Sequence, residues 1–215
     1  PHKNPKAAYS QSDLLQKIVF KPWDSKRLIG NVQYSESSNI NRLDQLNDYQ
    51  GGVLKFEDWY YGPQKRFLTA LTFQDWERHC FSDNIEIVAA FQNIQESRHN
   101  KKTSQDFRTD KYEDIDVWSL NAHVIKRYFG YGFEVQHNDL NSTARLFFPQ
   151  QDSSAVFLTT RYPGKLAKMT TAAAYIKKLF NIHSTLKANA GIRLTKSWLK
   201  GAYTFDPSVF KLPYE

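Results

Sequence analysis

The sequence predicts an α+β fold, with a mixed or antiparallel sheet, several helices and a helical C-terminal region. Five segments carry apolar residues at the three- and four-residue spacing of an amphipathic helix. Several short runs between them are rich in β-branched and aromatic residues, which favour strands. The two kinds of segment follow one another without the repeated strand–helix–strand order of an α/β protein. Apolar residues make up 40% of the 215 residues, which is enough for a buried core.

The first half of the chain is expected to hold two helices and four strands. Ser10 followed by Asp13 resembles a capping box at the start of a helix over 11–20. Thr72 followed by Asp75 begins a second helix that extends to Cys80. The expected strands are 27–35, 53–61, 65–71 and 85–91, the middle two forming a hairpin around Gly62-Pro63.

A polar stretch then interrupts the apolar pattern. Residues 96–110 contain a single apolar side chain, Phe107, among charged and amide residues. Such a composition predicts an exposed loop or linker. It divides the chain into an N-terminal α+β half, 1–95, and a C-terminal α+β half, 111–215, with a single domain over 1–215 as the alternative.

The second half is expected to contain three helices and three strands. A helix over 119–129 ends at Gly130, and the clearest helical pattern of the chain covers 165–180. A short helix over 194–200 follows. The expected strands are 133–135, 144–148 and 155–160.

Charge is segregated along the chain. The net charge is +7, and residues 153–205 contain nine Lys or Arg but no Asp or Glu. Cations interleaved with aromatic rings are typical of surfaces that bind phosphate backbones and stack on bases. The leading hypothesis is therefore a nucleic-acid-binding protein; an ordinary solvated face is the alternative. The candidate binding residues are Arg161, Lys165, Lys168, Tyr175, Lys177, Lys178, Lys187, Arg193, Lys196 and Lys200.

A group of acids offers a second hypothesis, a Mg²⁺-dependent endonuclease or another phosphoryl-transfer enzyme. Such enzymes need carboxylates that converge on a divalent cation. The candidate catalytic residues are Asp114, Asp116, Glu134 and Gln136, with Asp116 and Glu134 holding the metal. The alternative is a solvated acidic loop beside a helix. Apart from this Mg²⁺, the sequence predicts no cofactor.

The remaining features suggest a compartment. Cys80 is the single cysteine, and the N-terminal residues lack the apolar segment of a secretory signal. No run of eighteen apolar residues occurs, so no membrane partner is expected. These features predict an intracellular protein of the cytoplasm, nucleus or a virion. They also leave open a viral or assembly-type structural subunit that forms homo-oligomers.

Overall fold

The computed structural model describes residues 8–150, 153–158 and 160–202, without the side chains of 153–157, 165 and 166. Within these residues the chain is almost entirely β-structure, with thirteen strands and one helix, α1 (Leu43–Leu46). No helix in this part of the chain is long and apolar enough to cross a membrane.

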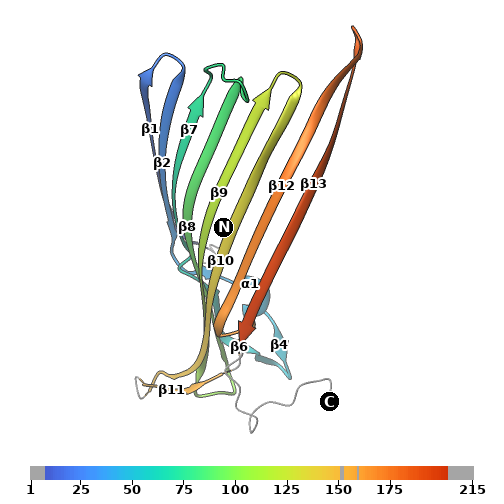
Figure 1. Ribbon diagram of the computed structural model, residues 1–215. Helices are drawn as coiled ribbons and strands as arrows, with labels where there is room; N and C mark the ends of the chain where they lie inside the picture. The colour runs from blue at the N-terminus through green and yellow to red at the C-terminus, as the bar shows by residue number, and fades with distance from the viewer. Residues whose placement is uncertain (1–7, 151–152, 159, 203–215) are drawn as a thin grey trace, which may run out of the picture.

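Eight long strands form one antiparallel sheet in which nearly every strand pairs with the next one along the chain (Figure 1). Their spatial order is β1-β2-β7-β8-β9-β10-β12-β13. The bounds are β1 (Gln11–Trp23), β2 (Lys26–Ser37), β7 (Lys65–Asp75), β8 (Asn84–Lys102), β9 (Arg108–Lys126), β10 (Phe129–Phe148), β12 (Lys165–His183) and β13 (Leu186–Ala202).

The two ends of this sheet differ. At the upper end in Figure 1 the strands are joined by residues 24–25, 76–83, 127–128 and 184–185. We call this the turn end. The lower end, which we call the loop end, carries the longer connections, 38–64 and 149–164, together with 103–107. The small elements lie there: α1, β3 (Ile40–Asn41), β4 (Tyr49–Gln50), β5 (Val53–Leu54), β6 (Phe56–Tyr61) and β11 (Ser153–Phe157).

The sheet buries very little apolar surface. Among the described residues the buried apolar side chains are Leu46, Phe56, Ala122, Ala144 and Ala173. The accessible surface of 15311 Å² is well above the roughly 10,000 Å² expected for a compact monomer of this mass. Large apolar side chains therefore lie on the surface, and nothing in this part of the chain covers them.

The predicted α+β fold is wrong. The segments 11–20, 165–180 and 194–200 lie in β1, β12 and β13 instead of helices. The segments 72–80 and 119–129 span strand ends and turns. In all of them except 72–80, apolar residues occur on both faces of a strand, and their combined spacing imitates a helical stripe. In 72–80 the apolar residues are divided between the end of β7 and the turn that follows it. The helix propensity of the alanines in β12 is overridden by pairing with β10 and β13.

Several local predictions agree with the structure. The predicted strands 27–35, 65–71 and 85–91 lie in β2, β7 and β8, and 133–135 and 144–148 lie in β10.

The polar stretch 96–110, which was predicted to be a loop, is mostly strand, because β8 continues to Lys102 and β9 begins at Arg108. A division into halves at this stretch stays a prediction, although one sheet runs through both.

Candidate functional site: two opposite faces of the sheet

Strand β9 shows how side chains are sorted between the two faces. Successive side chains of a strand point to opposite sides. Toward the turn end, Trp118, Leu120 and Val124 lie on one face, whereas Asn121 and His123 lie on the other. One face of β9 is thus apolar in this region and the other is polar.

The apolar face continues across all eight long strands. Directly paired residues share a face, so the registers can be followed from strand to strand. The row through the middle of this face is Phe20, Leu28, Phe73, Ile87, Ala122, Phe133, Ala174 and Leu194. The next row toward the loop end is Ile18, Gly30, Leu71, Ala89, Leu120, Val135 and Ala172, ending at Lys196. We call these two rows and the apolar residues that flank them the apolar band.

The height of the apolar band is set by charged residues on the same face. On β9 it extends from Asp116 to Lys126, ten residues or about 33 Å along the strand. With the tilt of about 40° that is usual for membrane strands, this length spans about 25 Å across the sheet. That is about the thickness of the apolar region of an outer membrane.

Aromatic side chains gather at the loop-end margin of the apolar band. The rings of Phe91 and Trp118 lie 4.3 Å apart, and those of Phe67 and Phe91 lie 6.5 Å apart. Trp118 is 57% exposed, so its large ring is not held in a protein core. Rings with this placement are typical of the boundary between lipid and water.

The opposite face, which we call the polar face, carries a hydrogen-bonded row at the same level. Its paired residues are Arg27, Gln74, Glu86, His123, Gly132, Tyr175 and Arg193. The Arg27 guanidinium donates to the amide oxygen of Gln74 (Nε···Oε1 2.8 Å), and the Gln74 amide donates to Glu86. Polar groups on this face form hydrogen bonds between neighbouring strands, as they do on the water-facing side of a membrane-spanning sheet.

Gly132 allows two of these side chains to meet. His123 Nδ1 and the Tyr175 hydroxyl lie 2.8 Å apart, on either side of Gly132 in the row. A Cβ atom at Gly132 would lie 2.7 Å from the Tyr175 hydroxyl oxygen and 2.2 Å from the Ala122 carbonyl oxygen. Only glycine fits at this position, because the Tyr175 hydroxyl and the Ala122 carbonyl oxygen occupy the space of a Cβ atom.

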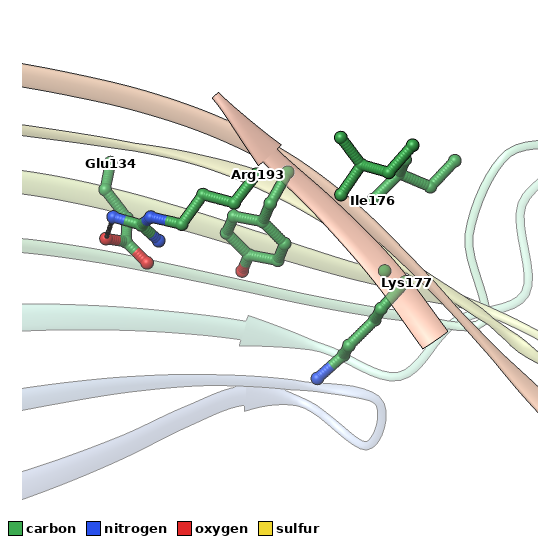
Figure 2. Close-up of a pocket in the computed structure, with 7 residues that line it drawn as sticks. Glu134, Ile176, Lys177 and Arg193 are labelled. Carbon is green, nitrogen blue, oxygen red and sulfur yellow. Dashed lines mark hydrogen bonds and ion pairs between the residues drawn. The ribbon is translucent and has the colours of Figure 1, made fainter. Parts of the chain in front are cut away.

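A shallow depression lies on the polar face beside β12 and β13. Figure 2 shows the Arg193 side chain extended toward Glu134, while Lys177 points away from this pair. The Arg193 Nη2 atom donates to Glu134 Oε2 at 2.6 Å. Both partners are partly exposed, so water screens this ion pair and its contribution to stability is small.

The predicted nuclease residues are not brought together. Glu134 pairs with Asn121, five residues along β9 from Asp116. Because Asp116 and the partner of Glu134 are an odd number of residues apart on β9, Asp116 and Glu134 lie on opposite faces, about 17 Å apart along the strands. Asn93 Nδ2 donates to Asp114 Oδ1 at 2.7 Å and to Asp116 Oδ1 at 2.8 Å. The polar-face Gln136 donates to Asn138.

The predicted basic surface is divided between the two faces. Lys168, Lys178, Lys196 and Lys200 lie on the face of the apolar band. Tyr175, Lys177, Lys187 and Arg193 lie on the polar face. Arg161 lies in the β11–β12 connection over the ring of Tyr162, and the Lys165 side chain lies outside the described part.

One group in the described residues has the geometry of metal ligands. Oxygen and nitrogen atoms of Asp75, Glu77 and His79 lie within 4.8 Å of one another. The Lys26 ammonium lies 3.1 Å from Glu77 and 3.7 Å from Asp75. A cation of the protein itself thus already contacts the two carboxylates and neutralises part of their charge.

A buried polar cluster stabilises the loop end. The fully buried Asp110 carboxylate accepts from Arg108 Nε at 2.6 Å and lies 2.7 Å from His99 Nδ1. His99 Nε2 is 2.9 Å from the Ser97 hydroxyl, which donates to the Gly62 carbonyl oxygen. This order of groups is similar to a hydrolase triad, but Ser97 is only 5% exposed. The cluster joins β8 to β9 and gives the hydroxyl no access to a substrate.

A carboxylate also holds the turn end together. Asp83 Oδ2 accepts the backbone N–H of Arg127 at 2.7 Å, and Oδ1 accepts from Lys126 Nζ at 2.9 Å. These bonds hold the pKa of Asp83 below its usual value. Arg127 has a left-handed backbone (φ 51°) in the tight β9–β10 turn, so Asp83 stabilises a conformation that most residues avoid.

Comparison with known proteins gives a likeness of fold alone. No protein-family model matches the sequence, and no curated protein matches it. Among solved structures, the chain is similar to the copper transporter OprC, with a TM-score of 0.65 and 10% identity over 90% of this chain. It is also similar to the ferric citrate transporter FecA in its unliganded form, with a TM-score of 0.57 and 13% identity over 92%. The chain spans 29% and 31% of the lengths of these two structures.

These findings correct the functional hypotheses. The fold is all-β and similar to part of two transporter structures, and nothing in the described residues supports a nucleic-acid-binding protein, a nuclease or an assembly subunit. The cations of β12 and β13 that were predicted to form one binding surface lie on two opposite faces, which removes the basis for a nucleic-acid partner. The expectation of an intracellular protein without a membrane partner is wrong as well: the described sheet exposes a wide apolar band, and its fold is similar to that of the two transporters named above.

The apolar band was not among the features predicted from the sequence. Its signal was present as strict alternation, for example in Trp118, Leu120, Ala122 and Val124 with polar residues between them. A period of two over about four to eight residues indicates a strand with one apolar face.

Proposed function

We propose that this chain forms part of the wall of a membrane transporter, with eight membrane-spanning strands in an outer membrane. The apolar band contacts lipid, and the polar face lines the interior through which a solute passes. The continuous row of apolar residues across eight strands is the observation that carries this proposal. Transmembrane strands alternate apolar and polar residues in this way.

The exposed surface supports lipid as the medium around the band. Phe20 is 59% exposed, Leu120 40% and Leu194 75%. An apolar area of this size in water is unfavourable, at roughly 25 cal/mol for each Å². Contact with lipid removes this cost without a second layer of protein.

The two ends of the sheet suggest an orientation. Strands of outer-membrane proteins are joined by short turns on the periplasmic side and by longer loops on the external side. We therefore place the turn end in the periplasm and the loop end outside. The described part of the chain leaves the outer edges of β1 and β13 without a strand partner. Further strands must complete the wall, because lipid cannot satisfy exposed backbone groups.

The proposal is tested by membrane extraction and by labelling of cysteines. The protein should remain in the membrane fraction after washing with alkaline carbonate, which releases peripheral proteins. Cys80, exposed at the turn end, should react with a membrane-impermeant maleimide only after the outer membrane is permeabilised. A matched variant, Ser104→Cys in a Cys80→Ser background, places the thiol at the exposed loop end and should react in intact cells. Release by carbonate would refute membrane insertion, and the reverse labelling pattern would refute the orientation.

A further inference from the structure

The basic residues of β12 and β13 meet the apolar band at one place. On β13, Lys196, Trp198 and Lys200 follow Leu194 toward the loop end and lie on the same face. Lys168 on β12 is the direct partner of Lys200. We call Lys168, Lys196, Trp198 and Lys200 the lysine cluster. It lies at the margin of the apolar band, on the lipid side and at the loop end.

We propose that the lysine cluster binds the phosphomonoester headgroup of a lipid in the outer leaflet. This inference rests on the proposed function, since it needs the apolar band to lie in a membrane with its loop end outside. In that position Lys168 and Lys200 lie at the level of the headgroups, and the ammonium of Lys196, one row inside the band, reaches this level beside the Trp198 ring. The phosphates of lipid headgroups are anions available at this level.

Charge balance favours an anion at this place. Like charges directly opposite each other on neighbouring strands are destabilising. Lys168 and Lys200 form such a pair. Among the described groups, Asp139 provides partial compensation through a 2.6 Å contact with Lys168 Nζ. Asp116 lies directly opposite Asp139 on the same face and accepts a hydrogen bond from Asn93. Three lysines and these two aspartates leave a net charge of +1, which favours an anion such as a phosphomonoester, with its charge of about −1.5 to −2 at pH 7.

Trp198 provides the apolar part of the site. Its ring is 48% exposed, and Lys196 Nζ lies 5.1 Å from the ring centroid. An indole at a membrane boundary packs against the upper acyl chain while its polar edge meets water. The cluster therefore offers a ring for the lipid body and ammonium groups for the headgroup, which is the combination a phosphorylated lipid needs.

Three other cations of these two strands point to the other side, whereas Lys178 lies on the face of the apolar band at its turn end. Lys177, Lys187 and Arg193 lie on the polar face, and Arg193 is already paired with Glu134. They have the same charge and lie on the same strands but are separated from lipid by the sheet. This set is a matched control for the lysine cluster.

The test uses quenching of tryptophan fluorescence by brominated lipids in nanodiscs. One variant keeps Trp198 as the sole tryptophan and a second keeps Trp118, which lies on the same margin away from the lysines. Brominated phosphatidic acid, a phosphomonoester lipid, is compared with brominated phosphatidylcholine, each at a low mole fraction. A lysine near an anionic surface contributes about fivefold in affinity, so the net charge of +1 predicts about a fivefold preference for phosphatidic acid at Trp198. We expect no preference at Trp118.

Substitutions assign the effect to the cluster. Lys168→Gln, Lys196→Gln and Lys200→Gln together should reduce the preference at Trp198 to about parity. The control with Lys177→Gln, Lys187→Gln and Arg193→Gln should retain it. As a measurement on the unaltered sequence, native mass spectrometry from micelles with equal amounts of the two lipids should show phosphatidic acid retained in excess.

The outcomes separate the two proposals. If neither lipid quenches Trp198 or Trp118, the membrane assignment itself fails. If both lipids quench Trp198 equally, or if the preference survives in the triple Lys→Gln variant, the sheet lies in a membrane but the lysine cluster binds no phosphorylated lipid.

Discussion

Replacing Leu120 by arginine places a charge near the middle of the apolar band. Leu120 lies four residues from Asp116 and six from Lys126 along β9. At about 3.3 Å for each residue and a tilt of about 40°, its side chain is about 10 Å from one polar margin and about 15 Å from the other. Arginine near the bilayer midplane of a membrane strand costs about 2–4 kcal/mol. Leu120→Arg should reduce the free energy of unfolding by that amount.

The neighbouring position provides the control. Asn121 lies on the polar face and pairs with Glu134, so an arginine there meets water and an opposite charge. Asn121→Arg should change the free energy of unfolding by less than about 1 kcal/mol. At the margin, Trp118→Arg should show a smaller cost from charge than Leu120→Arg, about 0–1 kcal/mol, beside the loss of the ring.

The three variants are compared by urea titration of the protein in phosphatidylcholine vesicles, monitored by tryptophan fluorescence and by the heat-dependent shift in gel mobility. A cost at Asn121 equal to or greater than that at Leu120 would refute the assignment of lipid-facing and interior-facing sides.

Three further predictions concern the sites that hold the strands together. Gly132→Ala should destabilise the protein by about 1–3 kcal/mol because the added Cβ overlaps its neighbours, whereas Gly30→Ala, with no atom within 4 Å, should be nearly neutral in the same titration. Asp110→Ala should cost about 3–5 kcal/mol, since it leaves the buried His99 and the Arg108 guanidinium without their carboxylate. Asp83→Asn should lower the thermal midpoint at pH 7. Because the folded pKa of Asp83 is depressed, this difference from wild type should be present above pH 3.8 and disappear as the pH falls through the folded pKa.

Each of these predictions has a result that contradicts it. Equal effects of alanine at the two glycines would show that the contact above Gly132 does not limit packing. An Asp110→Ala variant as stable as wild type would mean that the buried cluster does not join β8 to β9. For Asp83, a difference in thermal midpoint that persists unchanged at pH 2 would exclude its carboxylate as the source of the stabilisation.

The sequence allowed some strands to be predicted and others not, for physical reasons. Residues 85–91 are rich in β-branched side chains and indicate a strand without help from their neighbours. Residues 165–180 are rich in alanine and lysine, which have good intrinsic helix propensity, and their apolar residues occupy both faces of β12. Only pairing with β10 and β13 determines that this segment forms a strand instead of a helix, and no local pattern encodes that pairing.

The polar stretch 96–110 was misleading for a related reason. A soluble protein seldom extends a strand far beyond its core, so a long polar segment indicates a loop. Here β8 and β9 continue past the apolar band into a region where both faces meet water, and the buried Asp110 and His99 hold the two strands together. Residues 153–205 do lack acids, but the cations of β12 and β13 alternate between the two faces of the sheet and therefore do not form one surface.

The central claim is that the two faces of one sheet meet different solvents. It is tested most directly by placing a spin label at each position from 116 to 126 of β9 in a Cys80→Ser background, in lipid bilayers. Collision with oxygen, which dissolves in lipid, and with a water-soluble nickel chelate is then measured at every position. The account predicts a period of two, with Trp118, Leu120, Ala122 and Val124 open to oxygen and Ser119, Asn121 and His123 open to nickel. An alternation of the opposite phase, or no alternation along the strand, would contradict it.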